Sequence, residues 1–140
     1  MEKYYFTFDP RQKGLRKIFG DLEADIMEIL WSNGRLTVRE VFEKLKHKRR
    51  IAYTTVMTVM TRLAQKEILR KIKDGNAFIY EPVLTREKFS QTTSQAVLDG
   101  LLADFSSPLL SQLVDSLEKE DPKKILELSK LITAKLKKQK

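Results

Sequence analysis

The sequence is a basic chain of 140 residues, with 41% hydrophobic residues, 27 Lys and Arg against 19 Asp and Glu, and a net charge of +8. Its length allows one small domain core with an appended unit rather than two large domains. It contains no Cys and a single His, which excludes a disulfide framework, a thiol nucleophile and a clustered zinc site, so we expect neither a metal nor a cofactor.

Residues 1–19 are predicted to form an amino-terminal arm. Tyr4, Tyr5, Phe6 and Phe8 give the arm an aromatic start, and basic residues follow them. The aromatic rings can stack on nucleic-acid bases, or they can pack against the domain or a partner subunit. Packing is the favoured interpretation.

The segment after the arm predicts two helices. Apolar residues recur at helical spacing over residues 21–32, so we expect a helix that ends at Asn33-Gly34. Leu36 can then form a very short strand. Thr37-Val-Arg-Glu40 fits a capping box, in which Thr and Glu satisfy unpaired backbone amides, so a second helix is expected from there to about residue 47.

A third helix is predicted over about residues 53–66, with one apolar side and one side rich in hydroxyls. Thr54, Thr55, Thr58 and Thr61 together cost about 2 kcal/mol of helix propensity relative to Ala, and an exposed face offers no packing gain in return. Threonine hydroxyls and methyl groups can contact base edges. DNA reading by the first three threonines is therefore favoured over an ordinary solvated face.

A β-hairpin is predicted over residues 68–82, with its turn at Asp74-Gly75-Asn76, where Gly supplies a positive φ. Lys71 and Lys73 share one face of the hairpin and the residue between them points the other way, so the lysines can face phosphate while the other side packs. Asn76 at the tip can enter the minor groove or simply form the turn. Three helices followed by a two-stranded wing are typical of a winged helix-turn-helix.

Positive charge is concentrated in residues 44–73, where ten Lys and Arg accompany a single acid. A surface shaped by solubility alone usually intersperses both signs, so this patch indicates a polyanionic partner. Arg62 can reach a phosphate or a guanine or be simply an exposed charge, and a phosphate contact is the favoured interpretation. Tyr53 either contacts phosphate through its hydroxyl or completes a hydrophobic staple. The cluster that precedes the third helix can contact the DNA backbone or form a solvated charge run, and it consists of Lys44, Lys46, Lys48, Arg49 and Arg50. The last three are the predicted DNA contacts.

Residues 83–140 are predicted to form a helical dimerisation region. Thr85, Ser107-Pro108 and Asp121-Pro122 are start signals for three helices. Helices this short bury little by themselves, so we expect two copies to intertwine around a two-fold axis that matches a palindromic site. The residues expected at the dimer interface are Leu98, Leu101, Leu102, Leu109, Leu110, Leu113, Leu117, Ile125, Leu128 and Ile132.

Four segments carry a family likeness through their order and spacing: Gly20-Asp-Leu-Glu-Ala-Asp-Ile-Met-Glu-Ile-Leu-Trp31, Thr37-Val-Arg-Glu40, Ala52-Tyr-Thr-Thr-Val-Met-Thr-Val-Met-Thr-Arg-Leu63 and the hairpin from Gly75 to Tyr80-Glu-Pro82. Together they closely resemble the penicillinase-repressor family of the BlaI/MecI type over residues 20 to about 137. The resemblance implies a homodimeric transcriptional repressor bound to dyad-symmetric operators. It also implies recognition positions for Thr54, Thr55, Met57 and Thr58, and backbone-contacting positions for Arg62, Lys71 and Lys73.

The sequence departs from the family pattern in three places. The copper-responsive branch carries paired Cys-X-Cys motifs, and this chain has no Cys. In the β-lactam branch a sensor protease cleaves an Asn-Phe bond, whereas the nearest corresponding pair here is Gln112-Leu113. This difference puts a regulatory protease in doubt as a partner. The segment 1–19 is also longer than the usual lead-in.

The sequence therefore predicts a mainly α protein with a small β wing, in which an arm (1–19) precedes a winged helix-turn-helix (20–82) and a helical dimerisation region (83–140). We expect a sequence-specific transcriptional repressor that binds double-stranded DNA as a homodimer on a palindromic operator. The alternative is a protein-interaction winged helix that binds an acidic partner. No catalytic constellation, signal peptide or apolar run of about 20 residues is evident, so we expect a cytoplasmic protein that is not an enzyme and has no membrane partner.

Overall fold

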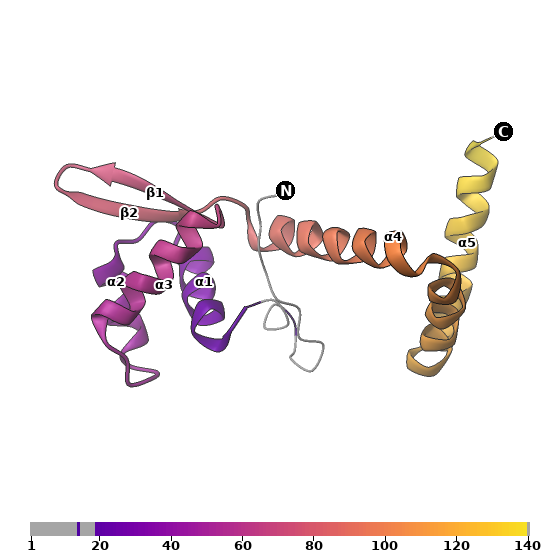
Figure 1. Cartoon of the computed structure of the whole chain (residues 1–140), viewed down its shortest axis with the longest axis horizontal. Coiled ribbons are helices and arrows are strands. Elements are labelled where there is room, and N and C mark those ends of the chain that lie inside the picture. The colour runs from indigo at the N-terminus through magenta and orange to yellow at the C-terminus, as the bar shows by residue number, and fades with distance from the viewer. Residues whose placement is uncertain (1–13, 15–18, 140) are drawn as a thin grey trace. The chain divides into compact units, whose positions relative to one another are not determined.

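A computed structural model describes residue 14 and residues 19–139 of the chain (Figure 1), and the aromatic residues expected in the arm lie outside this part. Within the described residues the division into two compact units falls between Thr92 and Thr93. Three helices and a two-stranded sheet form the amino-terminal unit, which confirms the predicted fold class of a winged helix-turn-helix followed by helices. The elements are α1 (Asp21–Asn33), α2 (Val38–Leu45), α3 (Tyr53–Gln65), β1 (Leu69–Asp74), β2 (Ala77–Pro82), α4 (Arg86–Glu120) and α5 (Pro122–Lys138).

The ends of the first two helices follow from local sequence signals. Gly34 ends α1 with a φ of 86°, and its N–H donates to the carbonyl oxygen of Leu30 at 2.7 Å. The predicted capping box opens α2, because Thr37 Oγ1 accepts the N–H of Glu40 at 3.1 Å and Glu40 Oε1 accepts the N–H of Thr37 at 3.0 Å. Both boundaries are therefore fixed by residues within a few positions of each other.

The core of the amino-terminal unit lies between its three helices and the base of the wing. Each helix contributes one apolar stripe, as the helical spacing predicts. A side chain placed on such a stripe is removed from water, which stabilises the fold by about 1.5–3 kcal/mol for each large aliphatic group. The fully buried members are Ile26, Met27, Leu30, Val41, Leu45, Val56, Met60 and Leu63.

The wing is an antiparallel hairpin closed by the two-residue loop Gly75-Asn76, where Gly75 has a φ of 62°. Leu36 pairs with Tyr80 as an isolated bridge, which confirms the short strand expected there. The register places Lys71 opposite Tyr80. Leu69 and Tyr80 are buried on that same face, so the expectation that the wing packs by the side opposite its lysines is wrong.

Helix α3 passes into the wing through a tight turn at Glu67. The N–H of Glu67 donates to the carbonyl of Ala64 at 3.0 Å, and the N–H of Ile68 donates to that of Leu63 at 2.9 Å. This is the hydrogen-bond pattern of a Schellman motif, which requires a left-handed residue and usually takes Gly there. Glu67 adopts that conformation with a φ of 62°, so the link between α3 and the wing carries backbone strain.

The first turns of α4 pack on the amino-terminal unit. Thr85 caps the helix by accepting the N–H of Lys88 at 3.1 Å. Phe89 is buried, stacks on Phe19 with ring centroids 5.2 Å apart, and lies 5.7 Å from the ring of Trp31. The chain beyond the wing is therefore anchored to α1 before it leaves this unit.

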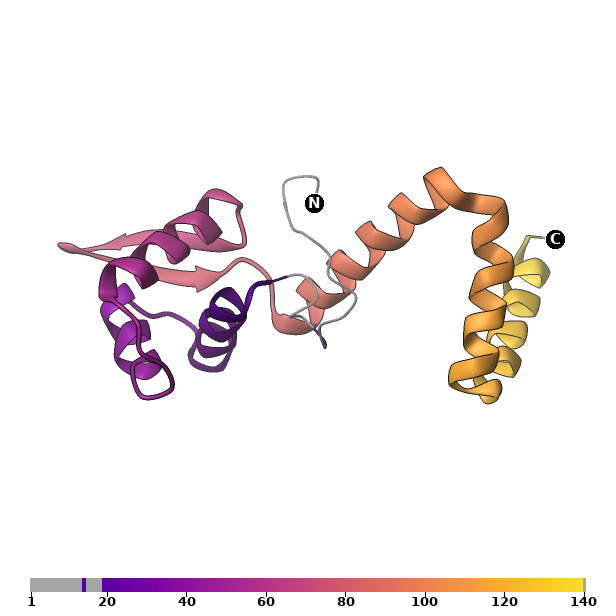
Figure 2. The ribbon, with the colours of Figure 1, turned by 60° about the horizontal axis from the view of Figure 1, so that its bottom comes forward.

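The helix predicted to begin at Ser107-Pro108 is not separate, because α4 continues through Pro108 to Glu120. Proline removes one backbone hydrogen bond and crowds the preceding turn, which bends a helix without necessarily ending it. The ribbon of α4 does bend sharply (Figure 2). The predicted start at Asp121-Pro122 is confirmed, since Asp121 accepts the N–H of Lys123 at 3.1 Å and α5 begins at Pro122.

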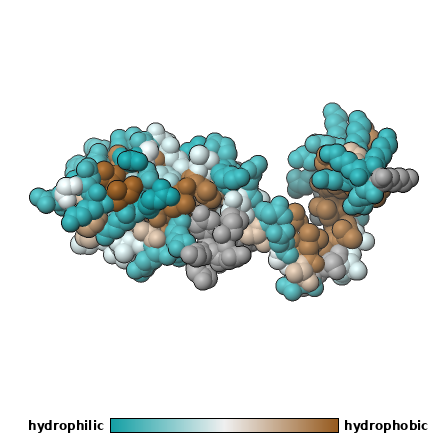
Figure 3. Space-filling model, turned by 90° about the horizontal axis from the view of Figure 1, so that it is seen from above, coloured by the Kyte–Doolittle hydropathy of each residue, from teal (hydrophilic) through white to brown (hydrophobic). Residues whose placement is uncertain are grey.

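The carboxy-terminal unit, formed by α5 and the greater part of α4, has almost no core of its own. The last turns of α4 and helix α5 lie side by side (Figures 1 and 2), yet α5 buries none of its residues. Apolar side chains gather on the open surface of this unit (Figure 3). No helix within the described residues is long and apolar enough to cross a membrane. The large apolar residues exposed here are Leu98, Leu101, Leu102, Leu110, Leu113, Val114, Leu126, Leu131, Ile132 and Leu136.

Candidate nucleic-acid interface

Helix α3 presents an outer face of small polar groups above its buried stripe. Val56, Met60 and Leu63 fix the helix on the core. The residues that the sequence assigns to base contacts all project away from the core, and Met57 among them is 40% exposed. They are Thr54, Thr55, Met57 and Thr58, and Arg62 is exposed one turn further along.

Two threonine hydroxyls of α3 are already used within the helix. Thr58 Oγ1 donates to the carbonyl of Thr54 at 2.9 Å, and Thr61 Oγ1 donates to that of Met57 at 2.8 Å. These bonds use the two hydroxyl hydrogens inside the protein, so these hydroxyls are weaker evidence for DNA contact than the sequence indicates. The Thr58 oxygen keeps its capacity to accept a hydrogen bond, and its methyl group can contact thymine.

The basic cluster before α3 divides into two kinds of side chain. Lys48 and Arg50 are exposed, as a phosphate contact requires. Arg49 instead donates through Nη2 to Asp25 Oδ2 at 2.6 Å, and the two side chains are 35% and 19% exposed. This ion pair fastens the loop before α3 to α1. A phosphate contact by Arg49 would therefore compete with a structural role that the sequence does not reveal.

Tyr53 opens α3 inside a small aromatic cluster. Its ring lies edge-on to that of Phe42, with centroids 5.8 Å apart and an interplanar angle of 81°. The guanidinium of Arg39 lies 4.8 Å from the centroid of the Tyr53 ring. Arg39 was not among the site residues predicted from the sequence. A cation in the first turn of a helix, where the helix dipole is positive, is a sequence signal that could have identified it.

The exposed part of the wing carries a second contact between a cation and an aromatic ring. Lys71 Nζ lies 4.3 Å from the centroid of the Phe78 ring, and Phe78 is 46% exposed. Lys73 and Asn76 are also exposed, near and at the turn. Phe78 was not among the predicted site residues, yet the hairpin register places it opposite Lys73 and so on the lysine face.

The other side of the wing carries an ion cluster around Glu81. Its carboxylate accepts Arg35 Nε at 2.8 Å and Arg70 Nη1 at 2.9 Å. The hydrogen bond from Arg70 is the largest influence and lowers the pKa of Glu81, burial opposes it, and Arg35 lowers the pKa further. Both arginines are thereby held by the wing itself, so they contribute less to a DNA-facing charge than Lys71 and Lys73 do.

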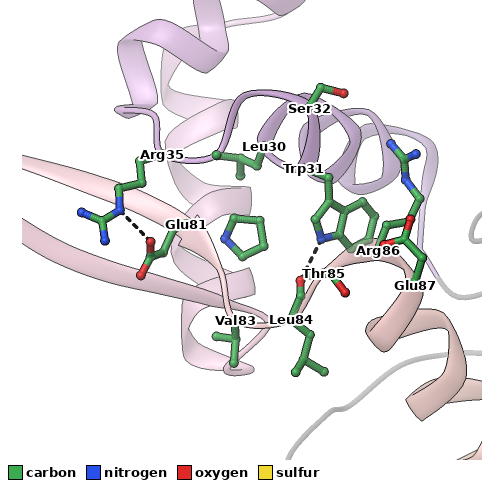
Figure 4. Close-up of a pocket in the computed structure, with 12 residues that line it drawn as sticks. Leu30, Trp31, Ser32, Arg35, Glu81, Val83, Leu84, Thr85, Arg86 and Glu87 are labelled. Atoms are coloured by element: carbon green, nitrogen blue, oxygen red, sulfur yellow. Dashed lines mark hydrogen bonds and ion pairs between the residues drawn. The ribbon is translucent and has the colours of Figure 1, made fainter.

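An open hollow of about 580 Å³ lies beside the root of the wing, between the end of α1 and the start of α4 (Figure 4). Trp31 Nε1 donates across it to the carbonyl of Leu84 at 2.9 Å. Arg35 pairs with Glu81 in its lining, and Arg86 pairs with Glu28. Both arginines of the lining are therefore paired with carboxylates. Within the described residues no group of three His, Cys, Asp or Glu side chains is placed to hold a metal ion.

Comparison with known proteins identifies a family and several relatives that this chain resembles. Residues 19–134 match the penicillinase repressor family. The transcriptional regulator BlaI of Mycobacterium tuberculosis is 49% identical over 98 residues, which are 69% of this chain and 62% of that protein. The penicillinase repressor of Staphylococcus aureus is 25% identical over 79 residues, which are 56% of this chain and 63% of that protein.

These matches therefore cover less than two thirds of the length of both relatives. Among solved structures, the monomeric form of Bacillus licheniformis BlaI in complex with the blaP half-operator is 26% identical, covers 49% of this chain and 84% of that chain, and has a TM-score of 0.44. Because residues 19–134 make up most of the sequence, the chain belongs to the penicillinase repressor family.

Proposed function

We propose that the protein is a sequence-specific DNA-binding transcriptional repressor. The observation that carries the proposal is the outer face of α3, where exposed threonines and Met57 project from a helix fixed on the core by its opposite stripe. Exposed cations flank this face in the loop before α3 and on the wing. A helix with small polar groups fits the major groove, while flanking cations contact phosphates on both sides of it.

The residues proposed to bind DNA are those predicted from the sequence. Some of them are free to contact DNA, and others also make contacts within the protein. Thr54, Thr55, Met57 and Thr58 contact base edges. Tyr53 and Arg49 are engaged in contacts within the protein, so their roles combine structure and binding. The proposed backbone contacts are Lys48, Arg50, Arg62, Lys71 and Lys73, with Asn76 at the tip of the wing.

A homodimer is the second part of the proposal. Exposed leucines on α4 and α5 leave a large apolar surface in water, and such surfaces mark interaction sites. A second copy supplies an apolar wall of the same shape and creates a two-fold axis. The dimer then places two α3 helices on the two half-sites of a palindromic operator and represses transcription by occupying it.

The names of the relatives support repression. The matched proteins of M. tuberculosis and S. aureus are called a transcriptional regulator and a penicillinase repressor. Release by a regulatory protease is a weaker part of the prediction, because the Gln112–Leu113 bond lies inside α4. A protease would reach this bond only after local unwinding of the helix.

Selection of bound fragments from random DNA, followed by footprinting of the winners, tests the proposal. We expect inverted half-sites separated by one helical turn, about 10 bp, or by a multiple of it. Binding to an acidic protein with no affinity for random duplex at low salt would instead support the protein-interaction alternative. Monomers in solution together with no protected DNA would contradict the proposal as a whole.

A further inference from the structure

We infer that Arg39 and Tyr53 form one phosphate-binding unit, in which the Tyr53 ring holds the Arg39 guanidinium against a single phosphate of the DNA backbone. This inference rests on the proposed DNA-binding function and names a contact that the sequence did not reveal. Arg39 lies in the first turn of α2 and Tyr53 is the first residue of α3. The unit therefore joins both helices of the helix-turn-helix.

The position of Arg39 at the start of α2 favours the binding of a further anion. The amino end of a helix carries a partial positive charge, so a cation in the first turn of α2 opposes the helix dipole. The Arg39 side chain is 65% exposed and gains little from burial. A bound phosphate would relieve this repulsion.

The contact of Arg39 with the Tyr53 ring leaves hydrogen-bond donors of the guanidinium available. The guanidinium carbon lies 4.8 Å from the centroid of the Tyr53 ring and 6.0 Å from that of Phe42, which are distances of a cation–π contact. The five N–H groups of a guanidinium lie in its plane and point outward from its edges. The edges are the part that binds a phosphate through paired hydrogen bonds.

The carboxylate nearest to Arg39 in the described structure is already committed elsewhere. Glu43 Oε1 lies 3.8 Å from Arg39 Nη1, which is too far for a hydrogen bond. The other oxygen of Glu43 is hydrogen-bonded to Lys46, and this bond is the main reason why the pKa of Glu43 is lowered. Glu43 thus attracts Arg39 weakly without occupying its donors.

The Tyr53 ring is a firm support because it is itself fixed. Phe42 packs against the core and meets the Tyr53 ring edge-on. A side chain ordered before binding loses less entropy when it meets its ligand. Since Thr54 and Thr55 follow Tyr53 directly, a phosphate bound here sets how far α3 enters the groove.

The test compares five variants of the full chain on the selected operator and on random duplex over a range of salt concentrations. Arg39→Ala is expected to weaken binding to both duplexes roughly tenfold and to lower the salt slope by about one. Arg39→Lys should keep the slope but lose part of the affinity. Tyr53→Phe should bind like the wild type, whereas Tyr53→Ala should lose as much as Arg39→Ala, and the double Ala variant should lose no more than either.

Arg86→Ala is the matched control, because it also removes one partly exposed Arg, one that is paired with Glu28 and lies outside the proposed interface. Thermal unfolding of each variant separates loss of binding from loss of fold. If Arg39→Ala behaves like Arg86→Ala while the wild type binds DNA, the inference is overturned and the proposed function stands. A loss in Tyr53→Phe equal to that in Tyr53→Ala also overturns it, because the hydroxyl would then make the contact. A wild type that binds no duplex at all overturns both.

Discussion

Individual side chains on α3 and on the wing are expected to have different roles in DNA recognition. Thr58 offers an oxygen and a methyl group to base edges, whereas Lys71 offers only charge to phosphates. The two kinds of contact differ in their dependence on sequence and on salt. This difference allows each role to be measured by itself.

Thr58→Ala should reduce discrimination between operator and scrambled DNA by about 1 kcal/mol or more, because a base-edge contact is lost. Lys71→Ala should weaken binding to both duplexes equally and lower the salt slope by about one. Titration of both duplexes at several salt concentrations measures the two effects. Equal losses on operator and scrambled DNA for Thr58→Ala would contradict its assignment.

Glu67 stores backbone strain that a single substitution should release. A non-Gly residue in the left-handed region costs about 1–2 kcal/mol, and Glu67 has a φ of 62°. Glu67→Gly should therefore have a higher free energy of unfolding than Glu67→Ala, by up to about 1 kcal/mol once the added flexibility of the unfolded chain is subtracted. Urea unfolding measures the change. Glu67→Ala, which keeps the strain and removes the same carboxylate, is the control and should not stabilise the protein.

Contacts between residues close in sequence could be predicted from the sequence pattern. Contacts between different helices could not. The capping box at Thr37 and Glu40 and the turn at Gly75 depend on neighbours only a few positions away, so the pattern alone predicts them. The ion pair of Arg49 with Asp25 and the contact of Arg39 with Tyr53 join different helices. The first-turn position of Arg39 could have singled out that residue, but the partners of both arginines are set by packing, which no local spacing encodes.

The wing is held to the loop after α1 by a cluster whose strength depends on pH. Arg70 and then Arg35 keep the pKa of Glu81 below its ordinary value of 4.5, so the ionised carboxylate stabilises the folded state. This contribution is fully present above the unfolded pKa and is lost as the pH falls through the folded one. The Glu81 side chain is 17% exposed and its partners are more than half exposed, so we expect less than about 1 kcal/mol.

Glu81→Gln should accordingly lower the melting temperature at neutral pH. It should not do so at acid pH, where the wild-type carboxyl is protonated and therefore uncharged like the Gln side chain. Thermal melts of both proteins from about pH 7 down through the lowered pKa of the folded state measure this difference, and the two curves should converge as the pH falls through that pKa. A difference that stays constant over this range would show that the hydrogen-bonded shape, rather than the charge, matters.

At the scale of the whole molecule, the carboxy-terminal unit leaves large apolar side chains exposed to water, which is energetically unfavourable. It buries almost nothing by itself, and Leu110 and Leu131 remain 59% and 60% exposed. The leucine-rich sequence predicted helices here, and it predicted that they need a partner. It did not predict that α4 continues through Pro108, because the local signal of a proline is the same for a bend and for a helix start.

Leu110→Asp should weaken dimerisation by about 3 kcal/mol or more, roughly a hundredfold, because each dimer loses two buried leucines and gains two charges at an apolar interface. Sedimentation equilibrium over a range of concentrations measures the change. Ser111→Asp adds the same charge at the next exposed position and should have a smaller effect. An unchanged dimer in Leu110→Asp would place the interface on another surface.

Trp31 is the only tryptophan of the chain, and its indole touches the segment that follows the wing through the carbonyl of Leu84 and the ring of Phe89. Indole emission is sensitive to hydration and to hydrogen bonding at Nε1. The protein therefore contains its own optical probe of whether the root of α4 stays docked, and fluorescence can follow that docking during DNA titrations without any attached label.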